Sequence, residues 1–330
     1  MNMRRYLIRG FIAVVLLAGL FPVLGPNAFG QDENYPAKPI KIVNPFPPGG
    51  TMDLLCRTFG AFLTELWGQP VIVDSIPGAG ATIGSRVTAT SAPDGYTIEF
   101  VSSSFAIAPS IYKSLPFDTI NDFTPIILLG ESPLFLAVHP SIEVSTVSEL
   151  VALARSKPGV LNYGSSGNGT SLHITDEWFK QVTKTDIRHI PYRGTGPALI
   201  DFLAGRVQMM FADAAVLAPV KAGKLKALAV ASDHRSFAMP DVPTLAEAGV
   251  PGFQNVTWYG VVGPKGIPRS VLMKLNDGLN RALKDKRTVE ALSLLAFDPV
   301  GGSPEHFGKA LKDNVRSYSE IVERGQISIK

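Results

Sequence analysis

Hydrophobic and polar residues near the start of the chain follow a pattern that occurs twice in succession. Residues 39–46 alternate like a short strand, the segment 47–50 (Pro-Pro-Gly-Gly) interrupts the alternation, and residues 51–67 carry apolar side chains at helical spacing. The same order of strand, glycine loop and helix follows over residues 71–92. Strands that alternate with helices predict an α/β fold with a mostly parallel sheet that helices cover on both faces.

The pattern starts again in the second half of the chain. A strand over 135–138, a helix over 147–155 and a helix over 172–183 are predicted around a glycine- and serine-rich segment, and three long helices close the chain after residue 268. Because these helices follow a complete α/β section, we expect a discontinuous first lobe and an inserted second lobe, with two chain crossings as a hinge. The predicted lobes are residues 31–136 plus 256–330, and residues 137–255.

The N-terminal segment has the order of a secretory signal peptide. Three arginines precede an apolar run over 11–24, and Ala28 and Gly30 supply the small residues that cleavage requires. The run is shorter than the ~20 residues of a membrane-spanning helix. We expect residues 1–30 to be a signal peptide and the exported chain to begin near Gln31. The paired arginines also fit a twin-arginine signal, so both this route and the Sec route stay open, and an uncleaved anchor is the alternative.

Charge and cysteine content narrow the functional classes. The chain has 31 basic and 28 acidic residues, and removal of residues 1–30 would take away three arginines and no acid, so the remainder is neutral. It has no row of basic residues that could neutralise phosphates, and we expect no nucleic-acid partner. Cys56 is the single cysteine, which excludes an intrachain disulfide. We expect it to be a small buried hydrophobic residue.

Two glycine-containing loops could bind an anion. The segments 47–50 and 164–171 each lie between the end of a strand and the start of a helix, where unpaired backbone N–H groups carry about half a positive charge. Hydroxyl groups in the second loop could also donate to a carboxylate. The alternative is that the glycines serve turn geometry and the hydroxyls cap helices.

Motifs that would indicate catalysis or a cofactor are absent from the sequence. The glycines of residues 78–84 miss the dinucleotide fingerprint by one position, and residues 164–169 lack the G-x-S-x-G nucleophile motif. The five histidines include no pair at metal-ligand spacing. We therefore expect no metal, no cofactor and no enzymatic activity. The alternative is a hydrolase or decarboxylase of small acids that uses Asp53 or His173.

Several short motifs, taken in order along the chain, resemble the substrate-binding receptors of tripartite tricarboxylate transporters, the Bug family. The resemblance covers nearly all of the chain after the signal segment. It rests on Pro45-Phe46-x-Pro48-Gly49-Gly50-x-x-Asp53, Pro77-Gly78-Ala79-Gly80, Pro93-Asp94-Gly95-Tyr96-Thr97, Tyr163-Gly164-Ser165-x-Gly167-x-Gly169-x-Ser171-x-His173, Pro191-Tyr192-Arg193-Gly194, Gly223-Lys224-Leu225 and Asp241-Val242-Pro243-Thr244.

The resemblance implies a periplasmic binding protein of type II-like fold, with two α/β lobes around a cleft. It implies a monomer that captures a small organic acid and delivers it to the permease subunits of a membrane transporter. A ligand-loaded signalling receptor is the alternative role. Asp213 lies in a stretch that varies among relatives, so the identity of the acid stays open. The ligand-binding residues expected from the loops and the resemblance are Phe46, Pro48, Gly49, Gly50, Asp53, Ser103, Ser104, Ser165, Ser166, Gly169, Thr170, Ser171, Thr195 and Asp213.

Overall fold

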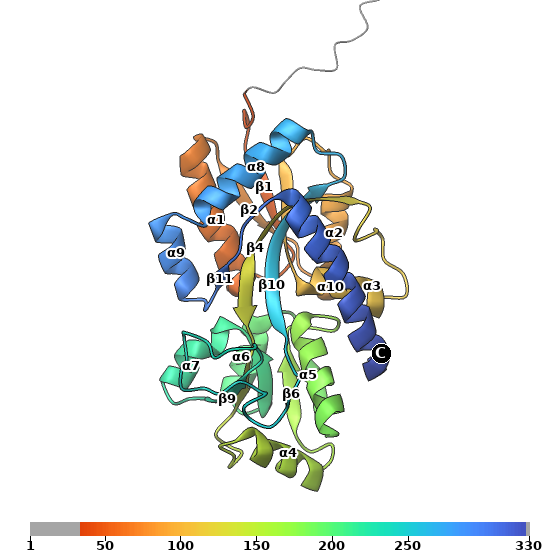
Figure 1. Ribbon diagram of the computed structural model, residues 1–330, viewed down its shortest axis with the longest axis vertical. Helices are drawn as coiled ribbons and strands as arrows, with labels where there is room; N and C mark the ends of the chain where they lie inside the picture. Colours follow the sequence, from red (N-terminus) through yellow and green to blue (C-terminus); the bar gives the residue numbers. More distant parts are fainter. Residues whose placement is uncertain (1–33, 328–330) are drawn as a thin grey trace, which may run out of the picture. The chain divides into compact units, whose positions relative to one another are not determined.

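The computed structural model describes residues 34–327 (Figure 1). The predicted signal peptide, residues 1–30, and the start at Gln31 lie outside these residues. Within the described part of the chain, no helix is both long enough and apolar enough to span a membrane.

The first of two sheets has six strands in the order β11-β4-β10-β3-β1-β2. β1 runs parallel to β2 and β3, whereas β10 is antiparallel to β3 and β4, and β11 is antiparallel to β4. The strands are β1 (Ile40–Asn44), β2 (Val71–Ser75), β3 (Thr97–Ser102), β4 (Phe123–Pro133), β10 (Val256–Pro264) and β11 (Asp298–Pro299). The helices in these parts of the chain are α1 (Thr51–Trp67), α2 (Thr82–Ala89), α3 (Ser103–Ile111), α8 (Arg269–Ala282), α9 (Lys286–Ser293) and α10 (Pro304–Gly325), with a 3-10 turn, η1 (Ala79–Ala81).

The second sheet has five strands in the order β7-β6-β8-β5-β9. β6 is parallel to β7 and β8, and β5 is antiparallel to β8 and β9. The strands are β5 (Phe135–Val138), β6 (Asn162–Ser165), β7 (Arg188–Pro191), β8 (Met209–Ala212) and β9 (Lys226–Val230). The accompanying helices are α4 (Val147–Ser156), α5 (Ser171–Thr183), α6 (Thr195–Leu203), α7 (Leu217–Lys221) and the 3-10 turn η2 (Ala214–Val216).

Two α/β sheets flanked by helices agree with the predicted fold class, but both sheets are mixed rather than mostly parallel. Each antiparallel pair among the described strands includes β4, β5 or β10, the strands next to the two places where the chain passes between sheets. A single residue, Leu134, separates β4 from β5, and the chain returns to the first sheet at β10 (Figure 1). A strand that leaves one sheet directly for another has no crossover helix to reverse it, so its neighbours are not constrained to be parallel.

Backbone hydrogen bonds hold the two crossing segments to each other. The amide of Ala231 donates to the carbonyl of Leu134 (2.8 Å), and the amide of Asn255 donates to the carbonyl of Ala231 (2.7 Å). The Asn255 side chain donates to Thr175 Oγ1 on α5 (2.5 Å) and accepts from Tyr318 Oη on α10 (3.2 Å). These bonds join the elements of both sheets at the crossing.

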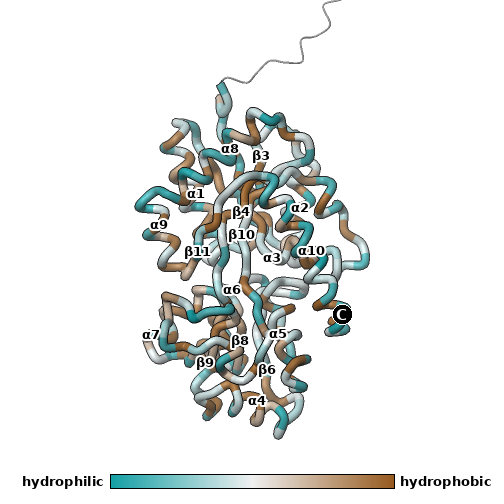
Figure 2. Tube along the Cα trace, in the orientation of Figure 1, coloured by the Kyte–Doolittle hydropathy of each residue, from teal (hydrophilic) through white to brown (hydrophobic). Residues whose placement is uncertain are grey.

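Several helices, α1 among them, pack one apolar face against the sheets. In α1 the buried residues recur at helical spacing, with Leu55, Phe59 and Leu63 fully buried. The helix ends at Gly68, whose left-handed conformation (φ 65°) lets its N–H donate to the carbonyl of Thr64. Hydrophilic and hydrophobic residues alternate in the same way along α8, α9 and α10 (Figure 2).

Candidate functional site

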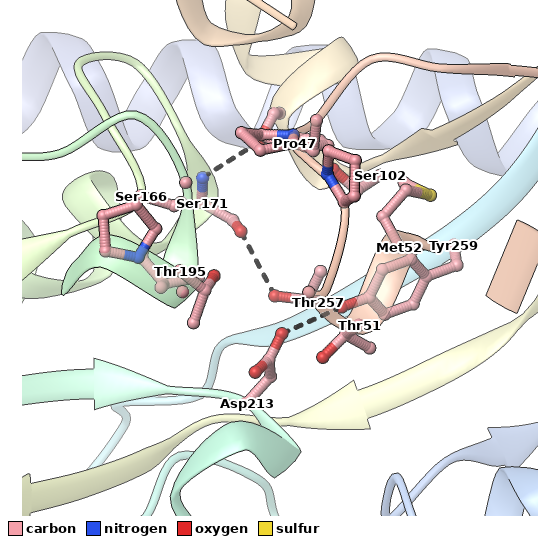
Figure 3. Close-up of a pocket in the computed structure, with 18 residues that line it drawn as sticks. Pro47, Thr51, Met52, Ser102, Ser166, Ser171, Thr195, Asp213, Thr257 and Tyr259 are labelled. Atoms are coloured by element: carbon pink, nitrogen blue, oxygen red, sulfur yellow. Dashed lines mark hydrogen bonds between the residues drawn. The ribbon is translucent and has the colours of Figure 1, made fainter. Parts of the chain in front are cut away.

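The starts of four helices surround a narrow cavity between the two sheets. Figure 3 shows residues that line this cavity. Its volume is about 50 Å³. The first turns of α1 and α3 line it from the first sheet, and the first turns of α5 and α6 line it from the second. Its lining residues are Phe46, Pro47, Pro48, Gly50, Thr51, Met52, Ser102, Ser104, Ser166, Ser171, Leu172, Gly194, Thr195, Gly196, Pro197, Asp213, Thr257 and Tyr259.

Three of these four helices begin without a side-chain cap. Their N-cap residues are Gly50, Ser102 and Gly194, and no side-chain hydrogen bond caps any of them within residues 34–327. The first N–H groups of a helix have no partner inside the helix, and each N-terminus carries about half a positive charge. Among the described residues that line the cavity there is no Lys, Arg or His. The positive potential at this cavity therefore comes from main-chain groups.

Asp53 fixes the loop before α1. Its Oδ2 accepts from the amide of Gly49 (3.0 Å) and from Arg57 Nε (3.0 Å), and its Oδ1 accepts from Asn44 Nδ2 (3.5 Å). Burial alone would raise the pKa of Asp53, but the hydrogen bonds from Arg57 and Gly49 outweigh it and hold that pKa below its usual value. Asp53 is buried and does not line the cavity, so its contacts hold the Pro-Pro-Gly-Gly turn in place.

The loop before α5 is supported from behind by two stacked histidines. His189 Nε2 lies 2.6 Å from Ser165 Oγ, and the amide of Gly169 donates to His173 Nδ1 (3.3 Å). The two imidazole rings stack with their centroids 4.3 Å apart. Burial lowers the pKa of His173 to about 4 and, with the neighbouring His173, that of His189 to about 3, so both rings are neutral at pH 7.

Residues of the two sides meet directly at the cavity. The amide of Ser171 at the start of α5 donates to Ser104 Oγ on α3 (3.2 Å), and the Ser171 hydroxyl lies 3.2 Å from Thr257 Oγ1 on β10 (Figure 3). On the rim, Tyr112 Oη donates to the carbonyl of Asn168 (3.3 Å). Elements that belong to the two sheets are therefore in contact with each other across the cavity.

Among the described residues that line the cavity, Asp213 is the one that carries a charged side chain. It follows β8 and caps η2, where its Oδ1 accepts from the amide of Ala215 (3.2 Å), while Oδ2 accepts from Tyr259 Oη (3.4 Å). Burial raises the pKa of the Asp213 carboxyl, although its hydrogen bonds partly oppose this. Burial also raises the pKa of Tyr259 well above its usual value, so this phenol stays protonated and is a donor.

Eight of the predicted ligand-binding residues line this cavity and six do not. Those that line it are Phe46, Pro48, Gly50, Ser104, Ser166, Ser171, Thr195 and Asp213. Ser103 Oγ accepts from the amide of Trp258, and Thr170 caps α5. The other four, Gly49, Asp53, Ser165 and Gly169, hold the two loops through the bonds given above.

Other lining residues were not named individually among the predicted ligand-binding residues. Thr51, Met52 and Leu172 are the next residues of helices whose starts were predicted, and Gly194 precedes α6 as Gly50 precedes α1. The same rule of a glycine before a helix could have found Gly194. Thr257 and Tyr259 lie on β10, a strand absent from the prediction, and nothing in their local sequence indicates an anion site.

A second, wider cavity of about 700 Å³ adjoins the narrow one and shares Phe46, Pro47, Ser166 and Gly194 with it. Prolines, glycines and the rings of Tyr112 and Tyr192 form much of its lining, with Arg193 as its charged residue. Within the described residues there is no cluster of three or more His, Cys, Asp or Glu that could hold a metal ion.

Solved structures with the same fold bind small acids or carry the name of periplasmic proteins. The chain is similar to the periplasmic binding protein BugD, with a TM-score of 0.86 and 29% identity over 89% of this chain and 100% of that chain. It is similar to R. palustris Rpa4515 with adipate, with a TM-score of 0.86 and 30% identity over 89% and 100%. It is also similar to MatC from Rhodopseudomonas palustris with bound malate, with a TM-score of 0.82 and 29% identity over 87% and 100%.

The sequence itself matches one family over most of its length. Residues 55–327 match the family described as tripartite tricarboxylate transporter family receptor. The chain is also 36% identical over 301 residues to protein BugT of Bordetella pertussis, which covers 90% of this chain and 92% of BugT. The resemblance inferred from the motifs is thereby confirmed, and the chain belongs to the family of tripartite tricarboxylate transporter receptors.

Proposed function

We propose that this receptor binds a small organic carboxylate in the narrow cavity and delivers it to the permease subunits of a tripartite transporter. In this proposal the two sheets and their helices act as two lobes, with boundaries close to those predicted from the sequence. The lobes rotate about the crossings at Leu134 and Asn255 and close on the ligand. The ligand carboxylate lies at the helix starts, and the rest of the molecule extends toward the wider cavity.

The observation that carries this proposal is the convergence of four helix N-termini on one cavity. Such termini bind anions through N–H groups that are already oriented and need no basic side chain. Ser104, Ser166, Ser171 and Thr195 add hydroxyl donors at the same place. Two similar proteins, Rpa4515 with adipate and MatC with malate, have a small dicarboxylate in their structures. Both observations favour a carboxylate over a neutral or cationic ligand.

We also propose that the receptor releases its ligand unchanged. Ser165 and His189 form a hydroxyl–imidazole pair of the kind that a hydrolase uses. Ser165 is fully buried, however, and neither residue lines the narrow cavity, so a bound carboxylate would not reach this pair. Asp53 and His173, the residues of the alternative enzyme hypothesis, are engaged with Gly49 and Gly169.

The remaining parts of the proposal concern location and assembly. We propose export to the periplasm by a signal peptide over residues 1–30, followed by function as a monomer. Mass spectrometry of the periplasmic fraction tests the first part, since the exported chain should begin near Gln31. Light scattering of the purified protein tests the second.

Calorimetry and unfolding experiments with a panel of mono-, di- and tricarboxylates test the binding function. A ligand at a hundredfold excess over its Kd should stabilise the protein by about 2.7 kcal/mol. Small-angle scattering should show a more compact protein with the ligand than without it. The amides of the same acids serve as matched neutral controls. Equal binding of an acid and its amide, or conversion of the acid at a rate proportional to protein, would contradict the proposal.

A further inference from the structure

Asp213 places a hydrogen-bond acceptor inside a cavity where the helix N-termini favour an anion. Its side chain is 4% exposed and points into the space between Thr195 and Thr51 (Figure 3). The carboxyl is held at both oxygens, by the amide of Ala215 and by the hydroxyl of Tyr259. Its position is therefore fixed by the fold, and it cannot turn away when a ligand enters.

The hydrogen bonds of Asp213 leave it able to accept more donors. A carboxylate has about four acceptor sites, and the described donors are one amide at 3.2 Å, one phenol at 3.4 Å and the hydroxyl of Thr51. The second distance is long for an O–H···O bond. The other hydroxyls nearby are partly engaged, since Ser171 and Thr257 pair with each other. A buried carboxylate with spare acceptor sites is stabilised by any further donor that enters the cavity.

When Asp213 is ionised, a ligand that offers only carboxylate oxygens to it would bring two acceptors together without a proton between them. In a cavity of about 50 Å³ with no cationic side chain in its described lining, nothing would separate or neutralise them. Like charges in a site of low dielectric constant repel, which is one way in which a binding site rejects a wrong partner. The helix N-termini favour the bound anion, and Asp213 restricts which ligand groups can lie next to that anion.

We infer that Asp213 is a specificity-determining residue that selects carboxylates bearing a hydrogen-bond donor, either a hydroxyl or an ammonium group, next to the bound carboxylate. The helix starts bind the carboxylate, and the donor binds Asp213. This inference rests on the proposed function and narrows its substrate class to hydroxy acids and amino acids. A plain dicarboxylate of the same length makes the first contact and lacks the second.

Calorimetry with three acids of one chain length tests the inference. Malate carries a hydroxyl, aspartate carries an ammonium group, and succinate carries neither. The wild-type protein should bind malate or aspartate at least tenfold more tightly than succinate, and the preferred member identifies the donor. In Asp213→Asn the side-chain amide can donate, so affinity for succinate should rise and the preference should fall below threefold.

A gain of affinity for succinate cannot come from a damaged fold, which keeps the test decisive. Asp277→Asn on α8, an exposed aspartate away from the cavity, is the matched control and should keep the wild-type preference. Equal wild-type affinity for succinate, malate and aspartate would overturn the inference and leave carboxylate binding intact. An unchanged preference in Asp213→Asn would also overturn it. Wild-type protein that binds none of a wide panel of acids would overturn both the inference and the proposed function.

Discussion

The substitution Asp53→Asn separates a loop-holding role from a ligand-binding role. Asp53 receives a hydrogen bond from the amide of Gly49 and another from Arg57, and it lies in the first turn of α1. A hydrogen bond to a charged group contributes about 1.5–3 kcal/mol, and a neutral acceptor keeps about half of that. The lost interaction with the helix N-terminus adds about 0.3–1 kcal/mol. Arg57 is largely exposed, so its share is small.

We therefore expect Asp53→Asn to lower the free energy of unfolding by roughly 1–2.5 kcal/mol. Urea unfolding followed by circular dichroism measures this change, and Arg57→Gln, which removes only the exposed partner, should leave stability nearly unchanged. The loss should also depend on pH. Because the pKa of Asp53 is lowered in the folded state, its contribution is complete above the unfolded pKa of about 3.9. It disappears as the pH falls below that value.

Ligand affinity completes this experiment. Asp53 does not line the narrow cavity, so calorimetry should show less than a threefold change in Kd for Asp53→Asn. A tenfold loss of affinity with an unchanged unfolding free energy would refute the reasoning, because it would make Asp53 a ligand contact rather than a support for the loop.

Three further predictions concern other parts of the structure. Burial raises the pKa of Glu99 to about 8, so wild-type protein should lose stability as the pH rises from about 4.5 to 8, by up to about 1.4 kcal/mol per pH unit. Glu99→Gln should lack this loss. A difference in unfolding free energy between the wild type and Glu99→Gln that stays constant across this pH range would contradict the assignment. Glu143→Gln, in an exposed loop, is the control. Gly50→Val should abolish binding without lowering the melting temperature, because a Cβ at Gly50 meets nothing within 4 Å and would stand in the cavity. Gly169→Val should instead lower the melting temperature, because Gly169 has φ of +76° and its Cβ would lie 3.2 Å from Ile111; equal melting temperatures for the two variants would argue against this distinction. Cys56 is buried and burial raises the pKa of its thiol, so iodoacetamide should modify it only in denaturant, as mass spectrometry can show, whereas rapid modification of the native protein would mean that Cys56 is accessible.

The parts of the site that depend on local sequence could be predicted. A glycine between a strand and a helix determines a helix start, and this rule found the segments that contain Gly50 and Ser171. It identified loops that lie beside the cavity, but it did not give the direction of each side chain. Ser165 and Thr170 point into the supporting structure, because the hydrogen bonds that turn them come from His189 and from the start of α5 itself.

The parts that depend on long-range pairing could not be predicted in the same way. Thr257 and Tyr259 reach the cavity because β10 pairs with β3 and β4, which lie far from it in sequence. The helix α3 was also missed. Its first residues are serines, it contains Pro109, and its apolar residues are buried on every side, so they show no helical period. The antiparallel direction of some strands could not be predicted either, because the sequence of an apolar run does not show which way the strand runs in the sheet.

The main-chain character of the cavity has a consequence for how such a protein can change through mutation. Every residue except proline carries an N–H group, so replacing a side chain at Ser166 or Thr195 removes a hydroxyl and leaves the backbone donor of that residue in place. In the proposed binding mode, the capacity to hold a carboxylate is thus encoded in the path of the chain, while the choice among carboxylates is encoded in a few side chains such as Asp213. In that binding mode, substitutions around the anion site can change which acid binds while the anion site itself is retained. We expect the side chains around the cavity to differ according to the uncharged part of each ligand. Binding of the ligand's carboxylate should require few specific side chains.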